Sequence, residues 1–309
     1  MDFVEPVSRP AKMFALLGPT ASGKSDVATV IARNRIAVGR PTEIVAIDAF
    51  TVYREMDIAT AKPSHETRNE IPHHMIDVYT PDQDVTVALF QRDARDVIER
   101  RHAAGVDLIL VGGSGLYWRA VVDDLRFPPT EAELRAALER RYPTNDEAYG
   151  ALRTKDPETA DALDVNNYRR VIRALEVNAL TGESFMAFQQ NWDTFTSRYD
   201  SMEVAYLHVE TEVLTKTIAH RSQAMVSNGL LDEAKGLREH WELSRTAAQA
   251  IGYHEAFGVL DGQMPLDALA DAVSQRTRRY AKRQRTWFRQ DPRCINMSAE
   301  AITEGWSAP

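Results

Sequence analysis

The sequence predicts an α/β protein, in which a parallel sheet is flanked by helices and an all-helical domain is inserted. Short apolar runs alternate with longer amphipathic stretches early in the chain, the pattern of strands joined by helices in a parallel sheet. A glycine-rich loop joins the first apolar run to a helix. From 130 to 191 the pattern is almost wholly helical, and an apolar run at 204–209 then restores a strand.

The first predicted strand, 13–17, leads into a phosphate-binding loop, and a helix over 26–33 follows the loop. The loop is a complete G-x-x-x-x-G-K-S/T motif, made of Gly18, Pro19, Thr20, Ala21, Ser22, Gly23, Lys24 and Ser25. Its position between a strand and a helix is the context in which this motif binds phosphate. Backbone amides point at phosphate oxygens, while Lys24 adds a charge and Ser25 a hydroxyl for Mg²⁺. The motif predicts a P-loop NTPase-like fold that binds a di- or triphosphate.

Two further predicted strands end in polar residues. The strand 43–47 is followed by Asp48, and the strand 106–111 runs into Gly112, Gly113, Ser114 and Gly115. Ligands of an open α/β sheet bind at the carboxyl ends of its strands, so Asp48 and Ser114 are expected beside the phosphate loop. Nucleotide-cleaving proteins usually hold Mg²⁺ with an acid at such a strand end, whereas the second strand ends in glycines, which let backbone approach a ligand. Asp48 alone is equally compatible with a turn or a helix cap.

The remaining elements define the domain organisation. A helix is predicted over 87–104, and Pro128 and Pro129 interrupt the chain before the helical stretch. Thr130 followed by Glu133 predicts a capping box for the first inserted helix, and Gly182 ends a later one. We therefore expect a flexible leader at 1–11, a P-loop α/β core, an inserted helical domain and a C-terminal tail. The core comprises 12–128 and 197–291, the insertion 129–196 and the tail 292–309.

Eight blocks of the chain resemble, in order and spacing, those of the bacterial tRNA dimethylallyltransferases. The blocks are 18–25, 48–63, 72–77, 111–117, 169–177, 229–230, 250–253 and 277–284. The resemblance covers roughly residues 12 to 290. It implies transfer of a dimethylallyl group from dimethylallyl diphosphate to the N6 amine of the adenosine on the 3′ side of the anticodon. The implied substrates are tRNAs that read codons starting with U, and pyrophosphate is released.

The resemblance also implies roles for residues. Asp48 is the family's general base, which suits the chemistry because the conjugated adenine amine is a poor nucleophile. Ser114, where the family usually has Thr, and Lys24 complete the implied catalytic set. Diphosphate and Mg²⁺ would bind at the phosphate loop, with Ser25 as the metal ligand. The diphosphate-binding residues are Gly18, Thr20, Ala21, Ser22, Gly23, Lys24, Ser25 and Arg221. The tRNA-binding residues are Asp48, Ala49, Phe50, Thr51, Ser114, Arg135, Arg169, Arg170, Arg173, Arg278, Lys282 and Arg283.

The chain departs from the family pattern in a few places. The family commonly has Asp-Ser-x-Gln where this chain has Asp48, Ala49, Phe50 and Thr51. Thr217 stands where many relatives have Arg, and Lys216 is expected to replace part of that charge. Ala59 replaces a usual Gly. These differences concern substrate contacts rather than the class of reaction.

The charge distribution favours a polyanionic partner in spite of a net charge of −8. Local clusters of cations, not the total charge, determine phosphate binding. Between 276 and 289 the chain has basic residues without an acid among them: Arg276, Arg278, Arg279, Lys282, Arg283, Arg285 and Arg289. A solvated helix face is the alternative interpretation of this run. A second cluster comprises Arg169, Arg170 and Arg173.

The composition narrows the class of protein. With 309 residues and 44% hydrophobic residues, the chain suits a soluble α/β enzyme with a large core. The single cysteine, Cys294, excludes an intramolecular disulfide and an appended zinc finger. No apolar run has the length of a membrane helix or of a secretion signal, so we expect neither, and the cysteine usage favours the cytoplasm. We also expect a monomer without an obligate protein partner.

The residues leave other functions open beside tRNA dimethylallyl transfer. An adenylate isopentenyltransferase, which makes a cytokinin, shares the chemistry but does not need the helical insertion. A P-loop small-molecule kinase would need a Mg²⁺-binding acid and an arginine lid. In a noncatalytic tRNA-binding module, Asp48 and Ser114 would be dispensable while the basic clusters would matter.

Overall fold

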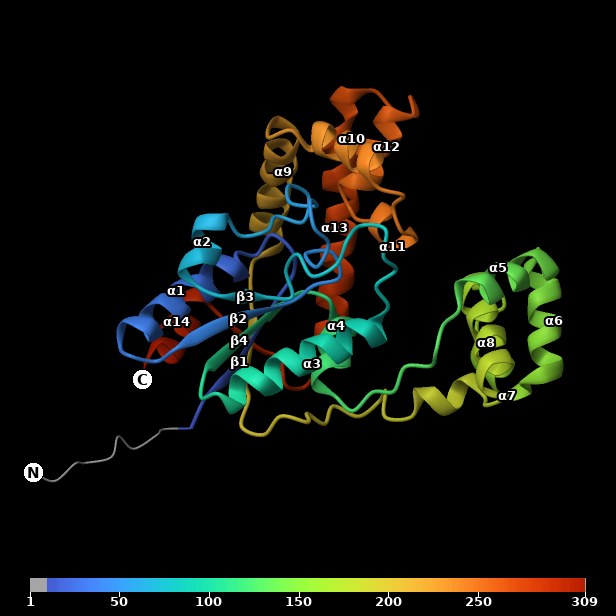
Figure 1. Cartoon of the computed structure of the whole chain (residues 1–309), viewed down its shortest axis with the longest axis horizontal. Coiled ribbons are helices and arrows are strands. Elements are labelled where there is room, and N and C mark those ends of the chain that lie inside the picture. Colours follow the sequence, from blue (N-terminus) through green and yellow to red (C-terminus); the bar gives the residue numbers. More distant parts are fainter. Residues whose placement is uncertain (1–9, 309) are drawn as a thin grey trace, which may run out of the picture. The chain divides into compact units, whose positions relative to one another are not determined.

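The computed structural model describes residues 10–308, which form two compact units (Figure 1). The larger unit takes in the chain up to Val122 and from Tyr199 onward, and the smaller unit is Asp123–Arg198. Most of the expected leader, residues 1–9, lies outside the described residues. Within the described part of the chain, no helix is both long and apolar enough to cross a membrane.

The larger unit contains one six-stranded sheet with the strand order β3-β2-β4-β1-β5-β6, and every pairing is parallel. The strands are β1 Met13–Leu17, β2 Thr42–Ile47, β3 His73–His74, β4 Asp107–Gly112, β5 Glu203–Leu207 and β6 Ile295–Met297. The predicted α/β fold with a parallel sheet is confirmed. The central strands β1, β2 and β4 are buried along nearly their whole length, which explains their continuous apolar sequences.

Helices cover both faces of the sheet. On one face, Phe14 of β1 packs with helices α1 and α14, and its ring centroid lies 5.0 Å from that of Trp306. On the other face, Phe90 and Trp118 bring α3 and α4 into the main core. The helical elements of the larger unit are α1 Lys24–Ala37, α2 His65–Glu70, α3 Val87–Ala103, α4 Gly115–Val122, α9 Thr211–Ser227, α10 Leu230–His240, α11 Arg245–Ala248, α12 Tyr253–Leu260, η2 Leu266–Ala268, α13 Leu269–Phe288 and α14 Ala299–Ser307.

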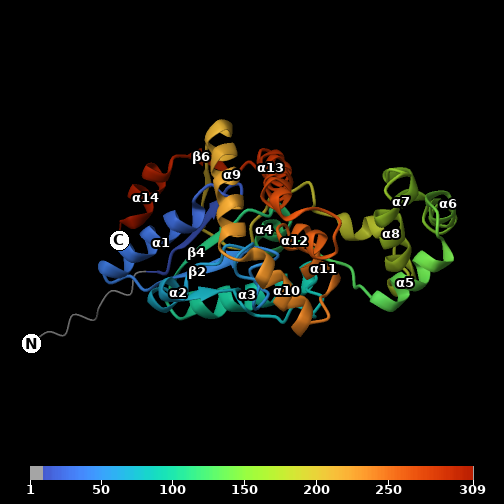
Figure 2. The same cartoon turned by 90° about the horizontal axis from the view of Figure 1, so that it is seen from above.

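The C-terminal segment belongs to the core, although the sequence analysis assigns 292–309 to a tail. Strand β6 pairs with β5, and α14 lies beside α1 in both views (Figures 1 and 2). The buried Arg35 of α1 donates from Nη1 to the carbonyl oxygens of Trp306 and Ala308, at 2.7 Å each. Its Nη2 lies 2.6 Å from Asp107 Oδ2. Because β6 has three residues and its Ile295 is exposed, it has no apolar run to reveal it.

The smaller unit is all-helical, as expected of the insertion. It consists of α5 Ala132–Arg141, α6 Asn145–Lys155, α7 Pro157–Ala162, α8 Tyr168–Thr181 and the 3-10 helix η1 Phe185–Gln189. These helices share a core of their own, built around Leu138, Leu152, Ile172 and Leu175. Gly182, with φ of 72°, ends α8 as predicted.

The capping box predicted at Thr130 is wrong. Helix α5 begins at Ala132, its N-cap is Glu131, and no side chain caps it. The Thr130 hydroxyl instead donates to Glu176 Oε1 at 2.9 Å, because that buried carboxylate competes for it. A capping box forms in this unit at α6, where the Thr144 and Glu147 side chains accept from each other's backbone amides.

Candidate active site

The phosphate loop connects β1 to α1 and leaves the first turn of α1 open to an anion. Gly23 is the N-cap of α1, with φ of 87°, and no side chain occupies the capping position. Ala21 also has a positive φ, 61°, which is rare for a residue with a Cβ and indicates a loop held in shape by its surroundings. The uncapped amide groups and the helix dipole favour negative charge at this point.

Two cations lie at this loop. The Lys24 Nζ donates to the Pro19 carbonyl oxygen at 2.7 Å. Burial, together with the nearby Arg221 of α9, lowers the pKa of Lys24 to about 7, while Asp48 partly opposes the shift. Burial also lowers the pKa of Arg221. Each cation is thus destabilised in the unliganded site, and an anion that reached both would be bound strongly.

Asp48 lies at the end of β2 and is fixed by a turn. Its Oδ1 accepts from the backbone N–H groups of Phe50, at 2.8 Å, and Thr51, at 3.3 Å. Asp48 also lines two neighbouring cavities. The turn that the sequence allows at this residue is therefore present, and it holds the carboxylate at the cavity wall.

The two cavities meet beside Asp48. One lies over the phosphate loop and is lined by residues of that loop, by Gly113 and by Arg221. The other has an apolar wall, made of Phe50, Ala59, Ile218, Met225, Ala250, Ile251 and Val273. Five residues line both: Thr20, Asp48, Thr60, Arg221 and Tyr280. The arrangement suits a reaction between a phosphate-bearing ligand in one cavity and a second group in the other.

Gln284 and Tyr280 of α13 are site residues that the sequence reasoning missed. The buried Gln284 donates from Nε2 to the Gly113 carbonyl oxygen at 2.7 Å and accepts at Oε1 from Thr20 N at 2.8 Å. It thereby joins the phosphate loop to the loop after β4. Tyr280 has side-chain hydrogen bonds to Gln284 and Ser114, and burial raises its pKa. The one signal for these residues in the sequence is that both lie in the block 277–284, which resembles the family.

The glycines after β4 serve close packing within the protein. A Cβ on Gly112 would lie 2.7 Å from the Ile47 carbonyl oxygen, and one on Gly113 would lie 2.6 Å from Gln284 Nε2. A Cβ on Gly115 would overlap the Trp287 ring. Because these glycines have no side chain, β2 and α13 pack closely against the loop that carries Ser114. The glycines therefore have a packing role in addition to the predicted approach of a ligand.

The basic residues of α13 divide into two groups. Arg276 pairs with Glu255 at 2.8 Å between Nη1 and Oε1, and Arg285 donates to the Val209 carbonyl oxygen and the Thr211 hydroxyl. The exposed members are Arg278, Arg279, Lys282, Arg283 and Arg289. Lys216 of α9 is 76% exposed and pairs with Glu212, so it does not replace the missing Arg in the cavity wall, where Thr217 lies.

In the smaller unit, two of the predicted tRNA-binding arginines neutralise a buried acid. Arg135 and Arg173 each lie 2.7 Å from Glu176 Oε2, and the Glu176 side chain has no exposed surface. Burial alone would raise the pKa of Glu176, but the Glu131 amide and these two arginines hold it below its ordinary value. Arg169 and Arg170 are exposed.

The donor set at the phosphate loop suits a hard cation. The exposed Ser25 and Asp26, together with Asp48, present a hydroxyl and carboxylate oxygens to one cavity, and oxygen ligands are those that Mg²⁺ prefers. Among residues 10–308, no group of three or more His, Cys, Asp or Glu side chains could hold a metal. A cation here would therefore need further ligands from the phosphate groups and water.

Comparison with known proteins assigns the chain to a family. A family model described as IPP transferase matches residues 51–291. The chain belongs to the IPP transferase family. Among curated relatives of this IPP transferase, the tRNA dimethylallyltransferase of Bifidobacterium longum is 41% identical over 91% of this chain and 85% of its own length. That of Paenarthrobacter aurescens is 40% identical over 97% of this chain and 92% of its own length.

Solved structures agree with this family. The tRNA isopentenylpyrophosphate transferase of Bacillus halodurans matches with a TM-score of 0.68 and 35% identity, over 96% of the IPP transferase described here and 94% of its own chain. A eukaryotic dimethylallyltransferase acting on tRNA matches with a TM-score of 0.76 and 25% identity, over 94% of this chain and 74% of its own. The resemblance found in the sequence is confirmed at the level of family and fold.

Proposed function

We propose that this chain transfers a dimethylallyl group from dimethylallyl diphosphate to the N6 amine of the adenosine on the 3′ side of the anticodon. The substrates are tRNAs that read codons starting with U, and pyrophosphate is released. The names of the relatives support this reaction. The observation that carries it is the position of Asp48, whose carboxylate lies where the phosphate-loop cavity meets the apolar cavity.

The diphosphate binds at the phosphate loop. The uncapped amides of α1, Lys24 and Arg221 supply donors and positive charge where the leaving pyrophosphate gains negative charge. Mg²⁺, bound through the Ser25 hydroxyl, would neutralise part of the charge on that group. In this scheme the phosphate loop serves a leaving group, which accounts for a strand β4 that ends in glycines rather than in an acid.

Asp48 acts as the general base. The bond from N6 to the prenyl carbon forms as the carbon–oxygen bond to the diphosphate breaks, and the N6 proton passes to the Asp48 carboxylate. The amides of Phe50 and Thr51 fix that carboxylate through its Oδ1. Ser114, placed by Tyr280, donates a hydrogen bond near the reacting amine.

The tRNA binds through exposed cations of both units. Arg278, Lys282 and Arg283 on α13, and Arg169 and Arg170 on α8, are exposed to solvent. The target adenosine must leave the anticodon stack to reach Asp48, an arrangement of the base-flipping kind. We also propose that the protein acts as a monomer and that it acts in the cytoplasm.

The test is incubation of the purified protein with Mg²⁺, labelled dimethylallyl diphosphate and unmodified tRNA, with AMP and ATP as parallel acceptors. Label in the tRNA alone is expected, at the adenosine next to the anticodon. Label in AMP or ATP would establish an adenylate isopentenyltransferase instead. No label in any acceptor would contradict the proposal, and ATP turnover in a parallel assay would then indicate a kinase.

A further inference from the structure

The segment 55–61, between β2 and α2, forms part of the cavity wall in a backbone conformation that needs support. Ala59 lines the apolar cavity, and Thr60 lines both cavities. Glu55 and Ala61, at the ends of this segment, have positive φ values of 62° and 50°. Such values cost free energy in residues with a Cβ and persist only where neighbouring groups hold the backbone.

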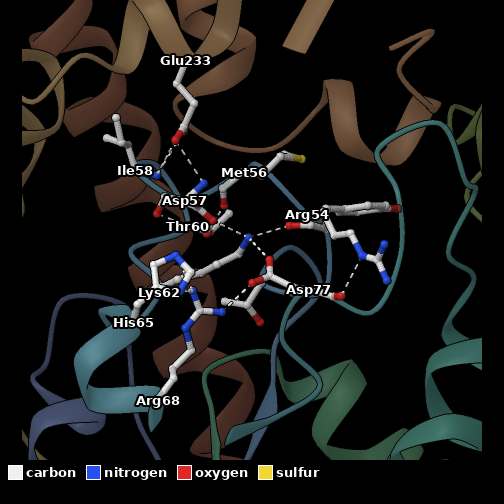
Figure 3. Close-up of polar contacts among 12 residues, drawn as sticks. Arg54, Met56, Asp57, Ile58, Thr60, Lys62, His65, Arg68, Asp77 and Glu233 are labelled. Carbon is white, nitrogen blue, oxygen red and sulfur yellow. Dashed lines mark hydrogen bonds and ion pairs between the residues drawn. The ribbon is translucent and has the colours of Figure 1, made fainter. Parts of the chain in front are cut away.

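Lys62 provides one support from within the larger unit (Figure 3). Its side chain is 2% exposed, and its ammonium group donates to three oxygens. The partners are the Tyr53 carbonyl at 2.6 Å, Asp57 Oδ1 at 2.7 Å and Asp77 Oδ1 at 2.5 Å. The ammonium group therefore uses all three of its hydrogens. Lys62 fixes the turn between Tyr53 and Asp57 at both of its ends.

Glu233 of α10 provides a second support from a distant part of the sequence (Figure 3). Its carboxylate accepts from the backbone N–H groups of Asp57, at 3.3 Å, and Ile58, at 3.0 Å. The Tyr253 hydroxyl of α12 donates to Glu233 Oε1. Two successive amides of the segment thus bond to one carboxylate, which Tyr253 in turn holds in place.

We propose that Glu233 and Tyr253 are positioning residues for the transfer reaction. They hold the backbone at 57 and 58 so that the following Ala59 and Thr60 form part of the wall of a cavity that Asp48 also lines, and they do not touch the reacting atoms. The inference rests on the proposed function, because it assigns the segment to the reacting end of that site. Among the described residues, Glu233 makes no hydrogen bond to the phosphate loop 18–25, so a change at Glu233 should leave the loop amides and Lys24 in place to bind the diphosphate.

The test compares Glu233→Gln with Glu239→Gln, a change on the same helix at an exposed residue that forms an ion pair with Lys235. A glutamine keeps the size of Glu233, but it has one acceptor oxygen in place of two. It therefore accepts hydrogen bonds from the backbone N–H groups more weakly. We expect Glu233→Gln to lower kcat with tRNA about tenfold, the scale of a small misplacement of reacting groups, and to leave the KM for the diphosphate within about twofold. Tyr253→Phe should have a smaller effect in the same direction, and Glu239→Gln none.

Hydrogen exchange separates this role from general destabilisation. In Glu233→Gln, the amides of 57 and 58 should exchange faster while those of the sheet exchange as in the wild type. Wild-type kcat, or unchanged exchange at 57 and 58, would overturn the proposal, as would an equal loss of protection throughout the sheet. If the wild type prenylates no acceptor, the proposed function fails, whereas the exchange experiment still decides whether Glu233 holds the segment.

Discussion

The charge of Lys24 depends on whether a diphosphate is bound in the site. Its pKa is lowered to about 7 without a ligand, by burial and by Arg221. A bound diphosphate favours the charged form and raises this pKa again. Between pH 7 and the pKa of the liganded state, binding therefore takes up a proton, and affinity falls as pH rises through this range.

We expect pyrophosphate binding with Mg²⁺ at pH 8 to take up close to one proton in the wild type. Calorimetry in buffers of different ionisation enthalpy measures this number directly. Lys24→Met, which has no titratable group, should bind more weakly and without that uptake. A wild-type binding enthalpy that is independent of the buffer would show that Lys24 does not change its protonation state on binding, which would contradict the prediction.

Asp48 allows a substitution that changes its charge and little else. In Asp48→Asn the amide oxygen can still accept from the Phe50 and Thr51 amides, so the turn is kept. We expect kcat to fall by about 10²–10⁴, the scale of losing a general base, with tRNA affinity nearly unchanged. Single-turnover prenylation and a tRNA-binding assay measure the two quantities, with the exposed Asp267→Asn as control. Retained turnover in Asp48→Asn would assign the base to another residue.

At this scale the phosphate-loop motif made Lys24 and Ser25 predictable, and Asp48 was predictable because it directly follows the buried strand β2. Gln284 and Tyr280 were not predictable in their roles, since the fold brings α13 to the phosphate loop from 264 positions away. The burial of Glu176 could not be predicted from the sequence either. The i,i+3 spacing of Arg173 and Glu176 is visible in the sequence, but neither the burial of Glu176 nor its pairing with Arg135 is.

Helix α12 meets the segment 55–61 through a glycine. Gly252 has φ of 97°, and a Cβ placed on it would lie 2.6 Å from the Cβ of Ala59. Gly252→Ala therefore introduces both an unfavourable backbone conformation, at about 1–3 kcal/mol, and a steric clash. We expect a marked loss in the free energy of unfolding, measured by urea denaturation.

The double variant Gly252→Ala/Ala59→Gly separates the two contributions. It removes the clashing methyl group but not the backbone strain, so it should recover part of the stability and remain below the wild type. Ala59→Gly alone is the control and should cost about 1 kcal/mol or less. A double variant as unstable as the sum of the single changes would mean that the two residues do not meet.

The strands show which elements can be predicted from sequence. Those buried on both faces, β1, β2 and β4, have continuous apolar runs and were found within a residue or two. The edge strands β3 and β6 were not, since they have two and three residues and depend on neighbours already in place. The misplaced capping box at Thr130 has a similar cause, because a tertiary acceptor outcompeted the local one.

For the whole molecule, a net charge of −8 means that tRNA affinity must come from cations that are exposed and not already paired. Arg169 is exposed, whereas Arg173 pairs with the buried Glu176. We expect Arg169→Ala to weaken tRNA binding and to reduce the slope of log affinity against log salt by about one, without changing stability.

Arg173→Ala should instead destabilise the smaller unit by about 1–2 kcal/mol, because it removes one of the two cations that compensate Glu176. Salt-dependent tRNA binding and thermal unfolding, measured on both variants, distinguish the two effects. Equal loss of affinity in both variants, with stability unchanged, would mean that Arg173 leaves Glu176 to contact phosphate.

The Arg35 contacts to Trp306 and Ala308 have a consequence for the order in which the protein can fold during synthesis. The sheet receives its strands β5 and β6 only after residues 123–198 have been made. The smaller unit is continuous in sequence and has its own core, so it can fold as soon as it leaves the ribosome. The larger unit cannot be completed until β6 and α14 have been made, and until then Phe14 of β1 lacks its contact with Trp306 of α14.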